Sequence, residues 1–321
     1  MCGFFVANYT NYYMKKSISQ FVGAISNRSL NRASFVKRFL ICSLLIPAIL
    51  LTTAFTLPNW AAARAQVIDN RTEVRLPILM YHSVLASKTG KYTVNPDDLE
   101  KDIIALKKAG FETVFMQDVI DWVDGKGNLP EKPIVITFDD GHYNNVSYGL
   151  PIAQKHDVKF LLNPVTSFSK YSVDSGDHSN PNYSHLTWEQ MRDAHKSGHI
   201  EFGNHTHAMH KFKPRYGVMK IGGECDETYR ENLRNDIEQA QRLIEEAGVP
   251  SPTTFAYPFG KYSAASKQAL LDMGFRALLT CNELINTIQK GKPETLHSLG
   301  RYNRDGHFST EKVLELVGAD V

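Results

Sequence analysis

The feature that most constrains the fold is a regular alternation of short apolar runs with amphipathic stretches from residue 76 onward. The clearest run is PIVITF at 133–138, whose β-branched residues favour a strand. Strands that alternate with helical stretches indicate βαβ units, in which the strands are parallel and helices cover the sheet. About seven repeats of this alternation suit an α/β barrel or a doubly wound sheet.

The individual elements follow from periodicity and from start and stop signals. Asn95 followed by proline opens one helix, and a capping box at Thr187 opens another. Two polar segments, 165–185 and about 211–227, are predicted as loops, and long loops of this kind are functional or mobile. The predicted strands are 76–81, 112–115, 133–138, 158–162, 200–202, 254–257 and 276–279, and the predicted helices are 95–110, 187–198, 228–247, 263–273 and 309–317.

A basic leader without acidic residues precedes this body. Residues 1–65 contain seven Lys and Arg and no Asp or Glu, and 39–57 is an uncharged apolar block. The small-residue ending at 63–65 is typical of an export signal that is cleaved before Gln66. Nineteen apolar residues are equally long enough to span a bilayer as a retained anchor. Both alternatives stay open, and both place the body outside the cytoplasm, secreted or at the outer face of the cell membrane.

Charge limits the partners of the body. Residues 66–75 are interpreted as a linker and 76–321 as one domain. Taking the seven leader cations from the 36 Lys and Arg of the chain leaves 29 against 34 acidic residues, a formal charge of −5. An acidic body matches a phosphate backbone poorly, so no nucleic-acid partner is expected, and membrane contact is expected only through the leader. Cys225 and Cys281 could pair outside the cytoplasm or stay free.

Two chemistry-bearing clusters follow predicted strands. The strand at 133–138 ends in Asp139-Asp140-Gly141, and adjacent carboxylates at a strand end suit a metal ion or, more simply, a turn. The strand at 200–202 leads into GNHTHAMH, with His205, His207 and His210. One carboxylate and two imidazoles leave a metal with open positions, as catalytic zinc sites require. Together the clusters predict a metal site at the carboxyl ends of parallel strands.

These motifs resemble the polysaccharide deacetylase family with the NodB homology domain, carbohydrate esterase family 4. TFDDG at 137–141, GNHTHAMH at 203–210 and FAYPFG at 255–260 carry the resemblance, which covers about 76–321. It implies a distorted (β/α)7-type barrel and an acetyl-removing hydrolase. It also implies that Asp139 is the general base and that Asp140, His205 and His210 hold a divalent metal, Zn²⁺ first and Co²⁺ or Ni²⁺ as alternatives.

The chain departs from the common family pattern at three places. The residue four after His205 is Met209, so the second ligand is expected at His210, a spacing similar to the poly-N-acetylglucosamine deacetylase branch; His207 is its rival. No Arg precedes the Pro-Tyr-Gly-like motif, and Arg301 in LGRYNRDG is the expected replacement that holds Asp139.

The third departure is the general acid. The C-terminal Leu-x-His motif is not clear, and MYHSV, which resembles the YH motif of the same branch, makes His82 the expected acid, with His297 and His307 as weaker alternatives. The backbone of Tyr257, Pro258, Phe259 and Gly260 is expected to contact the oxyanion or substrate, with the N–H of Phe259 as donor. The aromatic residues that could form a sugar platform are Tyr143, Tyr257, Phe259 and Tyr262, although each of them taken singly is better explained as a core residue.

The favoured hypothesis is a metal-dependent hydrolase that removes N-acetyl groups from a GlcNAc-containing polysaccharide, such as peptidoglycan, poly-GlcNAc or a chitin-like polymer. An O-acetyl esterase acting on xylan or another acetylated glycan uses the same site. A carbohydrate-binding protein with a degenerate site and another metal hydrolase complete the alternatives.

Overall fold

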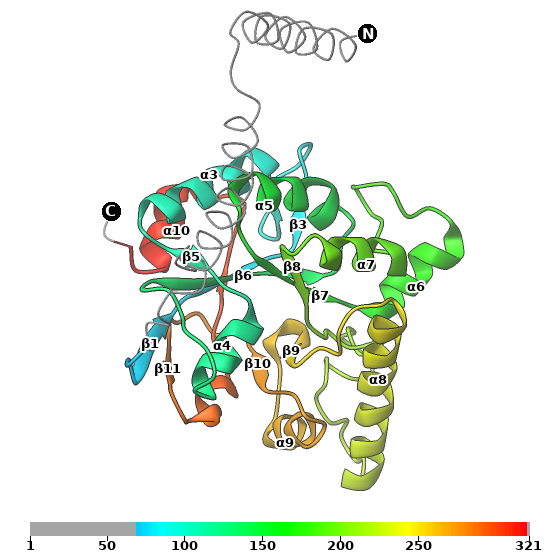
Figure 1. The fold of residues 1–321 in the computed structure, drawn as a ribbon. Coiled ribbons are helices and arrows are strands. Elements are labelled where there is room, and N and C mark those ends of the chain that lie inside the picture. The colour runs from blue at the N-terminus through cyan, green and yellow to red at the C-terminus, as the bar shows by residue number, and fades with distance from the viewer. Residues whose placement is uncertain (1–68, 320–321) are drawn as a thin grey trace, which may run out of the picture. The chain divides into compact units, whose positions relative to one another are not determined.

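The computed structural model describes residues 69–319 (Figure 1). The expected leader, with its apolar block at 39–57, lies outside the described residues. Between 69 and 319, no helix has the length and apolar character needed to cross a membrane. The segment interpreted as a linker contains most of β1 (Glu73–Leu76), which pairs antiparallel with β11 (Asn286–Gln289).

Parallel strands form the centre of the molecule. One sheet has the order β12–β2–β6–β7–β8, with β5 beside β6, and a second sheet consists of β9 and β10. Single bridges from Asn204 to Phe255 and from Leu279 to Leu299 join the two sheets, so seven parallel strands follow a closed path. Parallel strands with helices between them confirm the predicted α/β class. The strands are β2 (Ile78–Tyr81), β5 (Glu112–Thr113), β6 (Pro133–Asp140), β7 (Phe160–Pro164), β8 (Ile200–Phe202), β9 (Thr254–Ala256), β10 (Ala277–Leu279) and β12 (Tyr302–Asn303).

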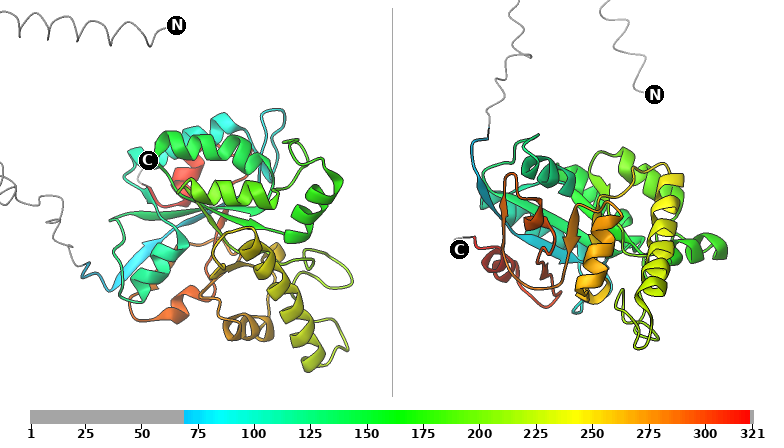
Figure 2. Two further views of the ribbon diagram at one scale, coloured as in Figure 1. Left: turned by 45° about the vertical axis from the view of Figure 1, so that its right-hand side comes forward. Right: turned by 90° about the horizontal axis from the view of Figure 1, so that it is seen from below.

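Helices cover the outside of the strands (Figure 2). The longest, α8, buries Tyr229, Leu233, Ile237 and Ile244, which recur at helical spacing and form its inner face. A short parallel pair, β3 (Ser83–Val84) and β4 (Thr93–Val94), precedes the first helix. The helices are α3 (Pro96–Lys108), α4 (Met116–Val123), α5 (Leu150–His156), α6 (Thr166–Ser175), α7 (Trp188–Lys196), α8 (Asp226–Glu246), α9 (Ala264–Asp272) and α10 (Thr310–Leu316).

The prediction of a loop over 165–185 is wrong, because α6 occupies its first half. This helix buries Thr166, Ser169 and Ser172, so its inner face is polar and small and shows no apolar period in the sequence. The hydroxyl of Ser172 accepts a hydrogen bond from His185 N–H at 2.8 Å, which ties the helix to the rest of the segment. Helices α4 and α5 were not predicted, since seven or eight residues are too few for a clear period.

A buried ion pair fixes the outer side of β2. Asp102 on α3 accepts from Arg304 Nε at 2.6 Å, from the Tyr81 hydroxyl at 2.9 Å and from the Thr310 hydroxyl at 2.7 Å. These contacts connect α3, β2 and α10. Tyr81 is the last residue of β2, so the network sets where the following residue, His82, enters the site.

Candidate active site

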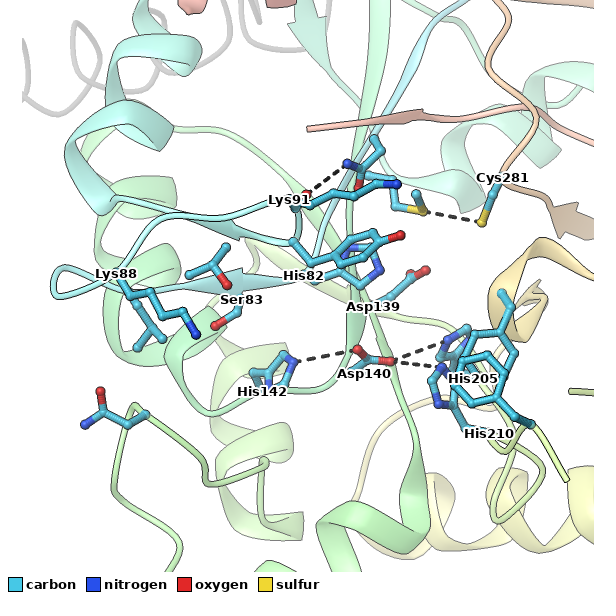
Figure 3. Close-up of a pocket in the computed structure, with 18 of the residues that line it drawn as sticks. His82, Ser83, Lys88, Lys91, Asp139, Asp140, His142, His205, His210 and Cys281 are labelled. Atoms are coloured by element: carbon cyan, nitrogen blue, oxygen red, sulfur yellow. Dashed lines mark hydrogen bonds and ion pairs between the residues drawn. The ribbon is translucent and has the colours of Figure 1, made fainter. Parts of the chain in front are cut away.

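The polar side chains at the carboxyl ends of the strands surround one cavity of about 840 Å³ (Figure 3). His82 follows β2, Asp139 and Asp140 end β6, and His205 and His210 follow β8. Parallel strands present their carboxyl ends at one edge, which is why segments far apart in the sequence meet there.

Asp140, His205 and His210 place three donor atoms within 4.8 Å of one another. Oδ1 of Asp140 lies 3.3 Å from His210 Nε2 and 3.7 Å from His205 Nε2. This buried oxygen has no hydrogen bond to any described residue. Nδ1–H of His205 donates to the carbonyl of Ala256 on β9 at 2.7 Å, which leaves the lone pair of Nε2 directed at Asp140.

The electrostatics of this cluster fit a divalent cation. Burial lowers the pKa of His205 to about 4, so its imidazole is neutral at pH 7. Burial opposes ionisation of Asp140, but His142 and His205 outweigh it and hold the pKa of this carboxyl well below its ordinary value. A carboxylate oxygen that faces two imidazole nitrogens is the donor set that Zn²⁺ and similar ions prefer, with positions left for water.

Three residues around the cavity have left-handed backbone conformations that are rare outside glycine. They are Asp140, Thr206 and Phe259, with φ of 70°, 76° and 58°. Gly141 also has positive φ, and a Cβ there would lie 2.7 Å from Pro164 Cβ, so only glycine fits beside β7. Strain of this kind persists where surrounding contacts over-determine the backbone, and it re-aims the adjacent side chains into the site.

Contacts from α8 hold the histidine loop. The carboxylate of Asp236 accepts from the N–H groups of His207 and Ala208, both at 2.8 Å. Oδ1 of Asn204 accepts from Thr206 N–H at 2.8 Å. Nδ1 of His207 lies 2.9 Å from the Thr166 hydroxyl on α6, so this imidazole points away from Asp140 and is not the rival ligand that the sequence left open.

Asp139 is paired with Arg301 inside the ring of strands. The guanidinium donates two parallel hydrogen bonds to the carboxylate, each of 2.8 Å, and the two side chains are 0% and 3% exposed. Asn163 Nδ2 donates to Asp139 Oδ1 at 2.9 Å, and Arg301 Nε donates to the carbonyl of Thr280 at 2.9 Å. Burial would raise the pKa of Asp139, but Arg301 prevails and holds it well below its ordinary range.

His82 forms part of the cavity wall next to these carboxylates. Its carbonyl accepts from Asn145 Nδ2 at 2.6 Å, and its ring lies edge-on to Tyr92 at 4.8 Å between centroids. Nδ1 of His82 is buried and has no hydrogen-bond partner among residues 69–319. Burial lowers the pKa of His82, which favours the neutral imidazole at pH 7. The weaker alternatives, His297 and His307, are not among the residues that line the cavity.

Three of the four aromatic residues considered for a sugar platform belong to the core, the alternative that the sequence favoured for each of them. Tyr143 and Tyr262 pack against the apolar core, and Tyr257 is fully buried and stacks on Tyr262 at 4.9 Å. Pro258 is buried as well, and only Phe259 of this group lines the cavity with its ring.

The aromatic wall that the structure contains consists of Phe259, Phe212 and Tyr216. The Phe212 ring stacks on Phe259 at 4.3 Å and is 67% exposed, and Tyr216 lies 5.3 Å from Phe259. Phe259 in turn packs on His210 at 4.4 Å. Sequence reasoning missed the wall because two of its members lie in the polar stretch 211–227. The recurrence of aromatic residues in FKPRY was the available signal.

Two further features of the cavity were not predicted. His142 Nε2 lies 3.7 Å from Asp140 Oδ2, and its ring stacks on His185 at 4.9 Å. His142 directly follows the DDG motif, which was the signal for it. Cys281 lines the cavity 3.7 Å from the sulfur of Met80, and both Cys281 and Cys225 are free thiols.

Comparison with known proteins matches the part of the chain that contains Asp139, Asp140, His205 and His210. Residues 126–278 match the family model for polysaccharide deacetylase. The chain is 23% identical over 211 residues to the poly-β-1,6-N-acetyl-D-glucosamine N-deacetylase of Escherichia coli K12, covering 59% of this chain and 31% of that protein. It is 23% identical over 169 residues to the enzyme of that name from Staphylococcus aureus MRSA252, covering 53% and 54%. The chain thus spans about a third to a half of these relatives.

Solved structures share the fold. Streptococcus pyogenes deacetylase PplD in complex with acetate has a TM-score of 0.62 and 21% identity, covering 77% of this chain and 99% of that one. IcaB from Ammonifex degensii has a TM-score of 0.63 and 22% identity, covering 76% and 97%. The resemblance drawn from the sequence motifs is confirmed, and residues 126–278 form a polysaccharide deacetylase domain.

Proposed function

We propose that this chain is a metal-dependent hydrolase that removes N-acetyl groups from a GlcNAc-containing polysaccharide and releases acetate. The observation that carries the proposal is one cavity in which a paired carboxylate, Asp139, lies beside the cluster of Asp140, His205 and His210. The names of the E. coli and S. aureus relatives support an N-acetylglucosamine polymer as the substrate.

Asp140, His205 and His210 would hold the metal, with Zn²⁺ as the first choice. When bound, a divalent ion supplies Lewis-acid polarisation of the acetyl carbonyl and lowers the pKa of water. The Ala256 carbonyl fixes the His205 tautomer that offers Nε2 to the ion.

Asp139 is the proposed general base. Arg301 keeps this carboxylate ionised and fixes the plane of its two oxygens, so the base is positioned before the substrate arrives. It accepts a proton from the attacking water as the new C–O bond forms at the acetyl carbon. A base whose pKa is held low is weak, so its contribution depends on position more than on basicity.

His82 is the proposed general acid. Its imidazole, neutral at rest, first takes up a proton from solvent, and the imidazolium then donates that proton to the amine nitrogen as the C–N bond breaks. The step yields acetate and a free amino sugar, and the proton that Asp139 accepted returns to solvent. The N–H of Phe259 is the proposed donor to the oxyanion, and Arg301 acts through Asp139 rather than on the substrate. The aromatic wall of Phe212, Tyr216 and Phe259 gives the apolar face of a pyranose ring a surface on which to stack.

The proposal places this activity outside the cytoplasm, with residues 76–321 as the deacetylase domain. It rests on the basic leader and the apolar block at 39–57, either as a cleaved signal or as an anchor.

Acetate release by residues 66–321 tests the proposal. N-acetylglucosamine oligomers and acetylated xylan are compared with and without added Zn²⁺, and Asp140→Ala is the inactive control. Zinc-dependent acetate from the oligomers, lost in the variant, is the expected result. Acetate from xylan alone would replace the proposal with an O-acetyl esterase, and metal-independent acetate would refute the role of the cluster.

A further inference from the structure

The cavity has a second wall that differs in chemistry from the aromatic one. Lys88 and Lys91 line it from the loop between β3 and β4, together with Tyr92. Figure 3 shows Lys88 across Asp140 from His205 and His210. A glycan that lies over the reaction centre therefore meets aromatic rings on one side and ammonium groups on the other.

The backbone of this loop is fixed. The carbonyl of Lys91 accepts from Asn303 Nδ2 at 3.0 Å, and Gly306 N–H donates to the carbonyl of Gly90 at 3.0 Å. Gly306 approaches so closely that a Cβ on it would lie 2.1 Å from the Thr93 carbonyl. Lys91 is thus held at the cavity by a close backbone contact with the segment after β12, and Lys88 lies two residues before the anchored Gly90.

The protein offsets only part of the charge of this wall. Neither Lys88 nor Lys91 forms an ion pair within the described range, and Lys91 Nζ lies 5.5 Å from the Tyr92 ring centroid. Of the three carboxylates that line the cavity, Asp139 is paired with Arg301 and Asp140 belongs to the proposed metal cluster. That leaves Glu283 in the cavity wall against the two ammonium groups, with Asp305, which is hydrogen-bonded to His307, interacting with Lys91 from outside the wall. A bound divalent cation would make the cavity more positive still.

We infer that Lys88 and Lys91 recognise an anionic substituent, a carboxylate or a phosphate, on the sugar next to the acetamido sugar that is cleaved. This rests on the proposed function and narrows its substrate class to an acidic glycan. The same wall disfavours a neighbouring sugar that already carries a free ammonium group, so the product of one deacetylation is a poorer neighbour for the next. Two partly exposed charge contacts should raise kcat/KM for an acidic substrate about fivefold over that for its neutral analogue at low salt.

The test compares four disaccharides that differ in the charge beside the acetamido group. N-acetylglucosaminyl-N-acetylmuramic acid carries a carboxylate, its methyl ester is neutral with nearly the same shape, and a 6-phosphorylated N-acetylchitobiose carries a phosphate. A half-deacetylated chitobiose carries an ammonium group. Acetate release gives kcat/KM for each with the Zn²⁺-loaded enzyme, at low salt and at 1 M NaCl, where the Debye length is about 3 Å.

The variant Lys88→Gln/Lys91→Gln tests the wall directly, and Lys108→Gln/Lys126→Gln is the matched control. The control removes the same charge from two exposed lysines outside the cavity. The wild-type enzyme and the control should prefer the acid over its ester about fivefold, and the cavity variant should lose that preference without losing activity on the ester.

A larger effect with the phosphate than with the carboxylate would assign the substituent to a phosphoglycan, and the reverse to a muramic-type glycan. Equal kcat/KM for acid, ester and half-deacetylated substrate in the wild-type enzyme would overturn the inference and leave the deacetylase proposal intact. No acetate from any substrate would instead contradict the proposed function.

Discussion

Replacing Arg301 by glutamine should lower the free energy of unfolding by about 3–5 kcal/mol, because the change leaves Asp139 as a buried charge without its partner. The wild-type guanidinium makes two 2.8 Å hydrogen bonds to Asp139, one of 3.1 Å to the Thr137 hydroxyl and one of 2.9 Å to the Thr280 carbonyl. Since both charged groups are almost fully buried, water cannot replace these contacts.

A double-mutant cycle separates the pair from the loss of packing. Asp139→Asn alone should cost a similar amount, because it strands the Arg301 cation instead. The double variant Arg301→Gln/Asp139→Asn carries neither charge, so its cost should fall short of the sum of the single variants by at least about 2 kcal/mol. Arg301→Gln combined with Asp102→Asn is the control, since Asp102 pairs with Arg304 in a separate network.

Urea unfolding of metal-free protein, followed by circular dichroism, measures all four free energies. Chelator in every sample keeps differences in metal affinity out of the cycle. Additivity within about 0.5 kcal/mol for the Arg301–Asp139 cycle would refute the reasoning, since it would mean that the two charges are not coupled.

Three further outcomes are expected. Asp140→Asn should weaken Zn²⁺ binding by more than about 100-fold, measured in competition with a chromogenic chelator. The variant His207→Ala should bind Zn²⁺ nearly as tightly as the wild type does. Equal losses of Zn²⁺ affinity in the two variants would contradict the ligand assignment. Burial raises the pKa of Glu201 to about 7 from 4.5, so the folded state holds this proton over a range in which the unfolded chain has lost it. This contribution to the free energy of unfolding is fully present below pH 4.5 and is lost, by up to about 3 kcal/mol, as pH rises through 7. Urea unfolding at several pH values should show a smaller loss for Glu201→Gln than for the wild type. An unchanged pH profile would show that Glu201 titrates normally. Phe212→Ala should raise KM for an N-acetylglucosamine oligomer several-fold with little change in unfolding free energy, while Tyr171→Ala, an exposed aromatic residue away from the cavity, should not; equal KM values would exclude stacking on Phe212.

The elements that were predictable are those whose sequence pattern matches their burial. β6 is buried along most of its length and carries β-branched residues, and α8 repeats apolar residues at helical spacing, so both were predicted nearly to their ends. α6 was missed because its buried face consists of Thr and Ser. Such small polar residues can pack closely, but they show no hydrophobic period in the sequence.

Some residues of the site were likewise predictable from the sequence pattern, and others were not. Asp139, Asp140 and His205 follow strong strands, so their meeting could be expected from parallel topology alone. His210 faces Asp140 whereas His207 contacts Thr166. Thr206, which precedes both, has a left-handed φ that no residue-type preference predicts in threonine. The contact of Arg301 with Asp139 was expected only through the family resemblance, and the structure contains it. The register of β12 beside β2, which brings Arg301 there, cannot be inferred from a two-residue strand.

The closed path of strands has a consequence for how long the folded protein lasts. Between β8 and β9 the backbone contributes a single bridge, so this seam is held mainly by side chains, and His205 crosses it to reach Ala256. An ion held by Asp140 and His205 would connect β6 to the imidazole that is hydrogen-bonded to Ala256, and so would hold that imidazole in place on one side of the seam. Removal of the ion should therefore weaken the contact of His205 with Ala256 and shorten the lifetime of the folded protein.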